Sequence, residues 1–352
     1  MNSSQTGNIE QAKIILNLIG TPFNDSTNSV SSDLNDLYTI AQKNKIGLLF
    51  LESLSQKNII NGLQEELTIQ RKSYSDQRET TARVSKVLNM IQCKHVIIKS
   101  SFPFPAVPND VDVLILGDDE EFNAAIKHMQ NNNYELMQIS PLETFMHDGR
   151  SGQHVNLMIK EAFDADIYKE VGASHIVYMD KKKLIDHISE ETINGAKVTV
   201  FKPAVEMALS IFHSIFPERI YTLLLHFYIL HTIKQMNSSD IEEFMLTCND
   251  HKISNAVLTA LRITEKIQEI CFGESPDKVT KLREAFGKKI PIEISRIPHQ
   301  YPMKLILNSF LSKSGDLAFT CSALRQAISM INPKMVRYLI SEYTKRKNRD
   351  TY

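Results

Sequence analysis

The segment KHVIIKSSFPFPAVPNDVDVLIL, residues 94–116, decides the fold. The β-branched run at residues 96–98 predicts a buried strand, which ends at the polar residues 99–101. Three prolines in residues 102–108 predict an irregular, extended loop. Residues 109–116 restore the strand pattern, with apolar side chains at residues 111 and 113–116, and predict a second strand. The segment therefore predicts two strands joined by a proline-rich loop.

Asp110 and Asp112 are the acidic residues of the second predicted strand. Because successive side chains of a strand point to opposite faces, these two carboxylates emerge on the same face. Two like charges this close are tolerated best when a cation lies between them. Magnesium takes oxygen ligands and is commonly held by one or two carboxylates together with substrate phosphates. We therefore expect Asp110 and Asp112 to be magnesium ligands.

The residues that follow extend this unit. Acidic residues 118–121 open a predicted helix, in which apolar residues recur at helical spacing. Three asparagines at residues 131–133 end the helix, and residues 134–139 predict a further strand. The predicted order is strand, proline-rich loop, acidic strand, helix and strand.

The end of a preceding predicted helix, residues 84–91, leads into the first strand, and the Asp110-Val111-Asp112 strand follows after the loop. This order and spacing resemble the nucleotidyltransferase superfamily, which includes DNA polymerase beta-like enzymes. The resemblance is closer to an uncharacterised prokaryotic nucleotidyltransferase branch. In that branch a helix leads to a strand ending Lys-Gly, and an Asp-x-Asp strand follows after a loop. The resemblance covers mainly residues 80–215.

The resemblance implies a role for each of these residues. In the family, the turn after the first strand cradles a nucleoside triphosphate, so Lys99, Ser100 and Ser101 are expected to bind the nucleotide. The two aspartates hold two magnesium ions, which makes Asp110 and Asp112 the expected metal ligands and catalytic residues. Ser100 stands where the family has glycine. It lacks a glycine's easy access to positive φ, although the serine hydroxyls could donate to phosphate instead.

The family's third acid lies on a later strand and helps to activate the acceptor hydroxyl. The best candidate strand covers residues 153–159, and the position aligned with that acid is Asn156. An amide can ligate a metal through its oxygen, but it is a far poorer proton acceptor than a carboxylate. Asp164 and Asp166 lie close enough in sequence to be substitutes. We predict Asn156 at the catalytic position, and leave open whether one of these two aspartates supplies the carboxylate.

Composition argues against several other classes. The chain has 352 residues with 40 basic and 41 acidic side chains, so no overall charge attracts nucleic acid or an acidic membrane. The four cysteines form no paired motif and the histidines lack zinc-ligand spacing, so we expect reduced thiols and no zinc. Residues 1–11 lack the pattern of a secretory signal, and the apolar stretch at residues 220–233 is too short to cross a bilayer. We expect a cytoplasmic protein without membrane contact.

We predict an α+β fold, in which a small mixed β-sheet nucleotidyltransferase-like domain is flanked by N-terminal helices and a C-terminal all-helical region. The predicted parts are an N-terminal helical region at residues 1–92, the α/β domain at residues 93–201 and the helical domain at residues 202–352. Within the α/β domain, residues 141–152 are predicted as a loop. A helix is predicted to begin at Asp180 with solvent-exposed lysines at residues 181–183. Asn194-Gly195 predicts a hairpin turn before the last strand of the sheet.

Three functions remain open. The first is nucleotidyl transfer with magnesium, from a nucleoside triphosphate to a hydroxyl of a protein, an RNA or a small molecule. The second is nucleotide and magnesium binding without transfer, because Asn156 replaces the base. The third is a helical interaction protein that keeps the fold alone. A third carboxylate beside Asp110 and Asp112 favours the first function, its absence from a retained polar pocket favours the second, and a filled pocket favours the third.

Overall fold

The computed structural model describes residues 7–27, 32–139, 142–148, 163–173, 176–287 and 291–329. The strands within these ranges are β1 (His95–Ile98), β2 (Val111–Ile115), β3 (Tyr134–Ile139), β4 (Glu143–Asp148), β5 (Ala165–Tyr168), β6 (Val171–Ala173), β7 (Ile176–Met179), β8 (Ile188–Ile193), β9 (Ala196–Phe201), β10 (Ile220–Tyr221) and β11 (His299–Gln300). The helices are α1 (Gly7–Ile19), α2 (Leu34–Lys43), α3 (Gly47–Gln56), α4 (Gln64–Asn89), α5 (Asp119–Asn131), α6 (Pro203–His213), α7 (Leu223–Gln235), α8 (Ser238–Asp250), α9 (Ser254–Phe272), α10 (Asp277–Phe286), α11 (Met303–Ser312) and α12 (Leu317–Ser329). In the described part of the chain, no helix is both long and apolar enough to span a bilayer.

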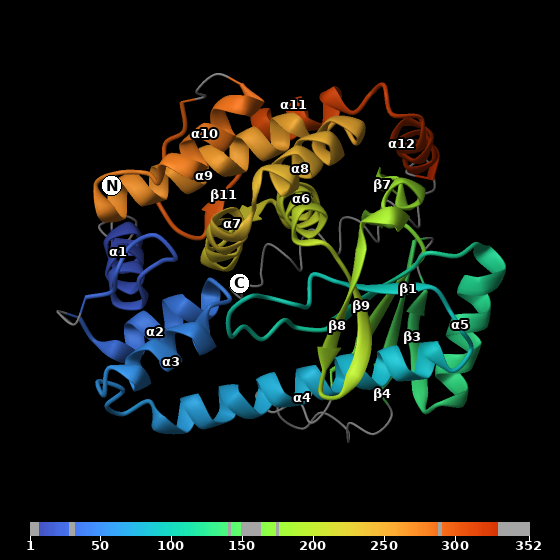
Figure 1. Cartoon of the computed structure of the whole chain (residues 1–352), viewed down its shortest axis with the longest axis horizontal. Helices are drawn as coiled ribbons and strands as arrows, with labels where there is room; N and C mark the ends of the chain where they lie inside the picture. Colours follow the sequence, from blue (N-terminus) through green and yellow to red (C-terminus); the bar gives the residue numbers. More distant parts are fainter. Residues whose placement is uncertain are drawn as a thin grey trace.

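Seven strands form one mixed sheet in the order β3-β4-β5-β2-β1-β9-β8. β1 pairs antiparallel with β2 and parallel with β9, and β2 pairs parallel with β5. The pairs β3–β4, β4–β5 and β8–β9 are antiparallel. In Figure 1 the N-terminal helices α1–α3 lie at the left, the C-terminal helices lie above, and α4 runs along the lower side of the molecule. The predicted α+β architecture, a mixed sheet flanked by N-terminal helices and a C-terminal helical region, is confirmed.

One face of the sheet packs on α4 and α5. Ile97, Val113 and Ile167 of the central strands belong to a core that also contains Val84 of α4 and Ala125 of α5. α4 packs along β1, β2, β8 and β9, and α5 packs against β3. Because side chains alternate along a strand, the residues next to these apolar ones point to the opposite face.

The opposite face of the sheet packs on the remaining helices. Ile98, Leu114 and Tyr168 belong to a larger core, which also contains apolar side chains of α1–α3 and α6–α9. Asp112 and Asp166 share the alternation of these residues. The two carboxylates therefore lie on the face that the C-terminal helices cover.

Two of the sheet's strands contradict the sequence-based expectation. The sequence predicts a loop at residues 141–152, but residues 143–148 form β4, between β3 and β5. The sequence predicts no strand at residues 165–168, where β5 lies. β5 is short and follows an acidic segment, and it is held by β2 on one side and β4 on the other. Pairing on both sides outweighs a weak local β-propensity here.

The segment after β7 also differs from the prediction. Instead of one helix beginning at Asp180, two single 3₁₀ turns cover Lys181–Lys183 and Ile185–His187. Lys181 is buried rather than exposed, and its Nζ donates to three backbone carbonyls, at distances of 2.6–3.2 Å. The prediction for Lys181 is wrong because these carbonyls come from other segments of the chain. The predicted hairpin turn at Asn194-Gly195 is confirmed between β8 and β9.

Candidate active site

Four strands present their ends at one edge of the sheet. β1 and β9 are parallel and end together, whereas β2 and β5 begin at this edge because β2 runs antiparallel to β1 and parallel to β5. The register pairs Ile98 with Asp112, and Asp112 with Asp166. Asp110 lies immediately before β2. We refer to Asp110, Asp112 and Asp166 as the acidic edge.

The acidic edge concentrates negative charge in a largely buried place. Asp112 is 6% exposed. Oδ1 of Asp166 is buried and, among the described residues, has no hydrogen-bond partner. Burial first, and then the charges of Asp110 and Asp112, raise the pKa of Asp166 to about 8. The mutual repulsion of these carboxyl groups makes the acidic edge a place where a cation is strongly favoured.

Lys99 supplies a positive charge at the acidic edge. Its Nζ lies 3.2 Å from Oδ1 of Asp112. It also lies 4.9 Å from the centre of the Tyr168 ring, which is within cation–π distance. Burial alone would lower the pKa of Lys99, but the charges of Asp112 and Asp110 outweigh it and raise the pKa above its usual value. Lys99 therefore remains protonated and neutralises part of the acidic edge.

The turn after β1 is held in an uncommon conformation at Lys99. Its φ of 52° is left-handed, which costs a residue with a side chain about 1 kcal/mol. Its N–H donates to Oε1 of Glu206 at 2.6 Å, and this bond helps to hold the turn. The resemblance implies a positive φ at Ser100, whereas the structure has it one residue earlier. Ser100 donates its hydroxyl to the Ile98 carbonyl at 2.9 Å and accepts the Asp112 N–H at 3.3 Å, which ties β1 to β2.

Glu206 connects the C-terminal helical region to this turn. It lies in the first turn of α6, which begins directly after β9. The side chain is 7% exposed, and its Oε2 is buried without a hydrogen-bond partner in the part of the chain that the structure describes. Burial raises the pKa of Glu206 to about 7, although the N–H and ammonium groups of Lys99 oppose this shift. The sequence analysis assigned no role to Glu206, because an acid in the first turn of a helix also complements the helix dipole.

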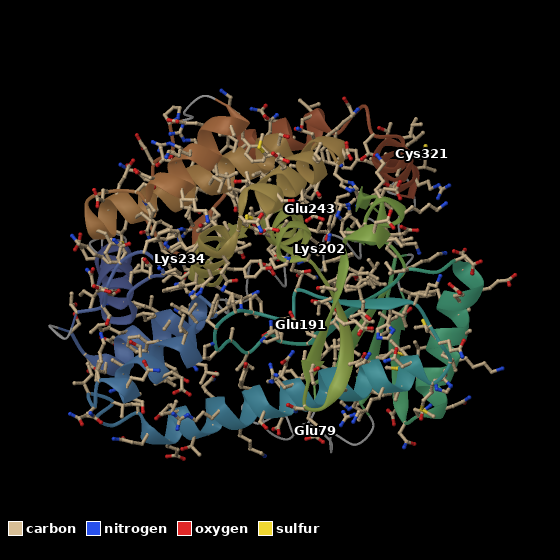
Figure 2. The ribbon with its side chains drawn as sticks, in the orientation of Figure 1. Glu79, Glu191, Lys202, Lys234, Glu243 and Cys321 are labelled. Carbon is tan, nitrogen blue, oxygen red and sulfur yellow. The ribbon has the colours of Figure 1, made fainter. Side chains whose placement is uncertain are left out.

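Ser101 lies at the exposed side of the same turn. Its hydroxyl donates to Oε2 of Glu191 on β8 at 3.1 Å. Figure 2 shows Glu191, Lys202 and Glu243 one above the other, from the β8–β9 hairpin toward α8. Lys202 and Glu243 form an ion pair at 3.0 Å. The turn is therefore held from α6 at Lys99 and from β8 at Ser101.

Tyr178 and His213 add a neutral pair near Lys99. The Tyr178 hydroxyl lies 2.9 Å from Nδ1 of His213. Burial, and next the positive charge of Lys99, hold the pKa of His213 well below its usual value. A neutral imidazole accepts the Tyr178 O–H, so this pair adds polar groups but no net charge.

The structure places most of the residues singled out from sequence. It brings Lys99 and Asp112 into contact and aligns Asp166 with Asp112, while Asp110 lies one residue before β2. Asn156 lies outside the described residues, so its predicted role stays a prediction. Asp164 contacts His147, with 2.7 Å between Oδ1 and Nδ1. Of the two substitutes for the third acid, Asp166 is the one paired with Asp112.

The donor chemistry of the acidic edge fits magnesium. Carboxylate oxygens are its usual protein ligands, and one or two of them suffice when substrate phosphates complete the shell. Within the described ranges, no three acidic, histidine or cysteine side chains are arranged to hold a metal ion by themselves. The pair Asp110 and Asp112, with the unpartnered Oδ1 of Asp166 beside it, fits an ion that arrives with a phosphate ligand.

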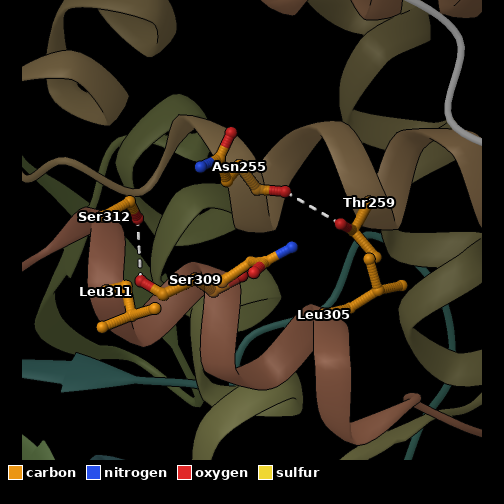
Figure 3. Close-up of a pocket in the computed structure, with 7 residues that line it drawn as sticks. Asn255, Thr259, Leu305, Ser309, Leu311 and Ser312 are labelled. Carbon is orange, nitrogen blue, oxygen red and sulfur yellow. Dashed lines mark hydrogen bonds between the residues drawn. The ribbon is translucent and has the colours of Figure 1, made fainter.

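A cavity of about 410 Å³ lies elsewhere, between α9 and α11 (Figure 3). It is lined by Asn255, Thr259, Leu305, Asn308, Ser309, Leu311 and Ser312. Two of its hydroxyls already donate to backbone carbonyls, Thr259 to Asn255 at 2.9 Å and Ser312 to Ser309 at 2.8 Å. The lining residues do not belong to the acidic edge, which is therefore a separate site.

Comparison with known proteins gives a partial structural likeness. No protein-family model matches the chain, and no curated protein matches it. Among solved structures, an antigenic nucleotidyltransferase-like protein from Paracoccidioides brasiliensis is 13% identical, with a TM-score of 0.32. The match covers 52% of this chain and 92% of that chain. A likeness this partial does not assign the chain to a family. Any argument about function therefore depends on the acidic edge itself.

Proposed function

We propose that the chain is a magnesium-dependent nucleotidyltransferase, which moves a nucleoside monophosphate from a nucleoside triphosphate to a hydroxyl group. The observation that carries the proposal is the register of β2 and β5, which pairs Asp112 with Asp166. This pairing supplies a third carboxylate beside Asp110 and Asp112. An acid whose pKa is strongly raised beside other acids, as that of Asp166 is, is common at catalytic sites and costly in a purely structural sheet.

Each residue has a distinct role in the proposal. Asp110 and Asp112 hold magnesium, which when bound neutralises charge on the phosphates. Lys99 and the hydroxyl of Ser101 bind phosphate oxygens. Ser100 supports them by tying the turn to β2.

Asp166 is the proposed general base. It accepts the proton of the acceptor hydroxyl while that oxygen bonds to the α-phosphorus and the bond to pyrophosphate breaks. Its position beside Asp112 and its unpartnered Oδ1 support this role. Asn156 is assigned no proton transfer, because an amide is a poor base.

Nucleotide binding without transfer is the second candidate. The observation that favours it is the 3.2 Å ion pair between Lys99 and Asp112. A carboxylate that is already paired has less charge to offer to a metal ion. The two candidates differ in whether labelled nucleotide reaches an acceptor.

Calorimetry tests the nucleotide site first. Each of the four ribonucleoside triphosphates is titrated, with and without magnesium, into the native chain and into an Asp110→Ala, Asp112→Ala variant. We expect binding that requires both magnesium and the two aspartates. Asp186→Asn, at an exposed acid of the second 3₁₀ turn, is the matched control and should bind as the native chain does.

Transfer is then followed with an α-labelled nucleotide and separate protein, RNA and small-molecule fractions as acceptors. Label that enters one fraction with the native chain, but not with Asp166→Asn, supports the enzyme. Magnesium-dependent binding without label in any fraction supports the second candidate. The absence of nucleotide binding by the native chain would overturn both.

A further inference from the structure

We infer that Lys99 is an exchangeable counterion, which pairs with Asp112 until a substrate phosphate draws it away, so that metal and nucleotide enter the acidic edge together. This inference rests on the proposed function and adds to it a coupling between metal binding and nucleotide binding. Its evidence is the contrast between the backbone of Lys99, which is held, and its ammonium group, which has few partners.

The backbone of Lys99 is anchored on the C-terminal helical region. Its N–H donates to the buried carboxylate of Glu206 at 2.6 Å, in the first turn of α6. The adjacent Ser100 hydroxyl bridges β1 and β2. The stem of Lys99 therefore starts from a defined point, and the ammonium group can change partner without movement of the turn.

The ammonium group of Lys99 has N–H donors that its contacts in the described structure do not use. Its contacts in the described structure are Oδ1 of Asp112, at 3.2 Å, and the face of Tyr168. An ammonium group has three N–H donors, and a ring face is a weaker partner than an oxygen. By contrast, buried Lys181 donates to three backbone carbonyls, and buried Lys313 donates to a carbonyl and to Asp316. Of these three lysines, Lys99 is therefore the one suited to a further oxygen ligand such as phosphate.

Charge balance couples the binding of metal to the binding of phosphate. Without nucleotide, a divalent cation that approaches Asp112 meets the positive charge of Lys99, and the two repel each other. A triphosphate brings several negative charges, so Lys99 gains a stronger partner and Asp112 becomes available to the metal. Metal and phosphate therefore favour each other's binding, and this coupling is reciprocal.

The test is calorimetry with two probes, Mn²⁺ alone and inorganic tripolyphosphate with magnesium. Lys99→Met keeps an unbranched side chain of nearly the same length but removes the charge. We expect it to bind Mn²⁺ alone about tenfold more tightly than the native chain and magnesium tripolyphosphate about tenfold more weakly. Lys99→Arg keeps the charge and should bind Mn²⁺ alone as weakly as the native chain does. Lys169→Met removes a half-buried lysine that pairs with Asp119 away from the acidic edge, and should change neither affinity.

Opposite shifts in the two affinities distinguish this role from a structural one, which would weaken both. The inference is overturned if Lys99→Met binds Mn²⁺ no more tightly than the native chain. It is also overturned if the native chain binds Mn²⁺ equally well with and without tripolyphosphate. Lys99→Gln gives the same comparison if the methionine variant does not fold. Failure of the native chain to bind magnesium nucleotide refutes the proposed function instead, while the Mn²⁺ comparison still decides whether Lys99 competes for Asp112.

Discussion

Two groups of buried charges in this molecule differ in how completely they are paired. Between α9 and α10, Glu265 is 2% exposed and contacts two arginines. Arg262 donates to its Oε2 at 2.6 Å, and Nε of Arg283 lies 3.1 Å from both of its oxygens. Both carboxylate oxygens of Glu265 are therefore satisfied.

At the acidic edge, by contrast, a buried carboxylate oxygen has no hydrogen-bond partner among the described residues. This oxygen is Oδ1 of Asp166, and Asp110, Asp112 and Asp166 share the charge of Lys99. Folded proteins satisfy nearly all buried polar groups, and exceptions gather where function needs them. The comparison indicates that the α9–α10 group serves stability, and it supports the proposal that the acidic edge binds a ligand.

The largest expected effect is that of Asp166→Asn on transfer. Loss of the general base should lower the rate of labelled nucleotide transfer by about 10²–10⁴-fold. The same change replaces a carboxyl group whose charged form is disfavoured by burial and by the neighbouring acids, so the free energy of unfolding in urea should stay within about 1 kcal/mol of the native value or rise. A loss of several kcal/mol in stability would place Asp166 with the structural charges and contradict the comparison.

Glu265→Ala should lower stability strongly, in contrast to Asp166→Asn. It removes the buried carboxylate that Arg262 and Arg283 share, and breaking a buried charge group in this way costs about 3–5 kcal/mol of unfolding free energy. Urea unfolding measures this loss. Glu284→Gln is the control, because Glu284 is an exposed partner of Arg283, and its replacement should cost less than about 0.5 kcal/mol. Equal effects of the two changes would show that the α9–α10 group carries no special share of stability.

The parts of the site that follow from sequence are those that local pattern decides. β-branched residues and alternation predicted β1 and β2, although β2 begins at Val111 and Asp110 lies just before it. The common face of Asp110 and Asp112 stays a prediction. The third acid depends instead on the register of β2 with β5, and these strands are far apart in the chain. Asp164 and Asp166 have the same two-residue spacing as the first pair, so spacing alone could not choose between them.

The burial of charged side chains could not be predicted from the sequence either. Lys181 and Glu206 each resemble ordinary residues of a first helical turn. Lys181 lies in a run of lysines, and Glu206 lies in a predicted helix that begins with a proline. Their roles arise from distant partners: carbonyls at the end of β2 for Lys181, and the Lys99 N–H for Glu206. Local periodicity carries no information on such contacts, because it describes which face of an element is apolar rather than what that face meets.

The pH dependence of stability tests whether a buried neutral group of the helical region, His226, is fully satisfied by its partners. His226 is fully buried, and burial lowers its pKa to about 3. It contacts Gln268 at 3.0 Å and Tyr221 at 3.3 Å. The folded pKa lies below the unfolded value of about 6.5, so its contribution to stability is present above pH 6.5 and is lost as the pH falls toward 3.

We expect His226 to contribute a slope of about 1.4 kcal/mol per pH unit between pH 6 and 4. Urea unfolding of the native chain and of His226→Gln over this range measures it, since glutamine does not titrate. Other buried histidines titrate in both proteins, so the difference between the two slopes is the readout. If stability depends on pH equally in the native chain and in His226→Gln, then His226 is not held neutral by its burial and its hydrogen bonds.

The smallest effect is expected for Ser101→Ala, at the exposed side of the turn. The hydroxyl contacts Glu191 at 3.1 Å where solvent competes, so the free energy of unfolding should change by less than about 0.5 kcal/mol. If the hydroxyl donates to a phosphate, the affinity for magnesium tripolyphosphate should fall about fivefold, the size of one neutral hydrogen bond. Ser100→Ala is the contrasting variant, because Ser100 is buried and bridges β1 and β2, and it should lose stability as well. An unchanged affinity in Ser101→Ala, measured by calorimetry, would limit the phosphate contacts of the turn to Lys99, because the Ser100 hydroxyl is already used within the sheet.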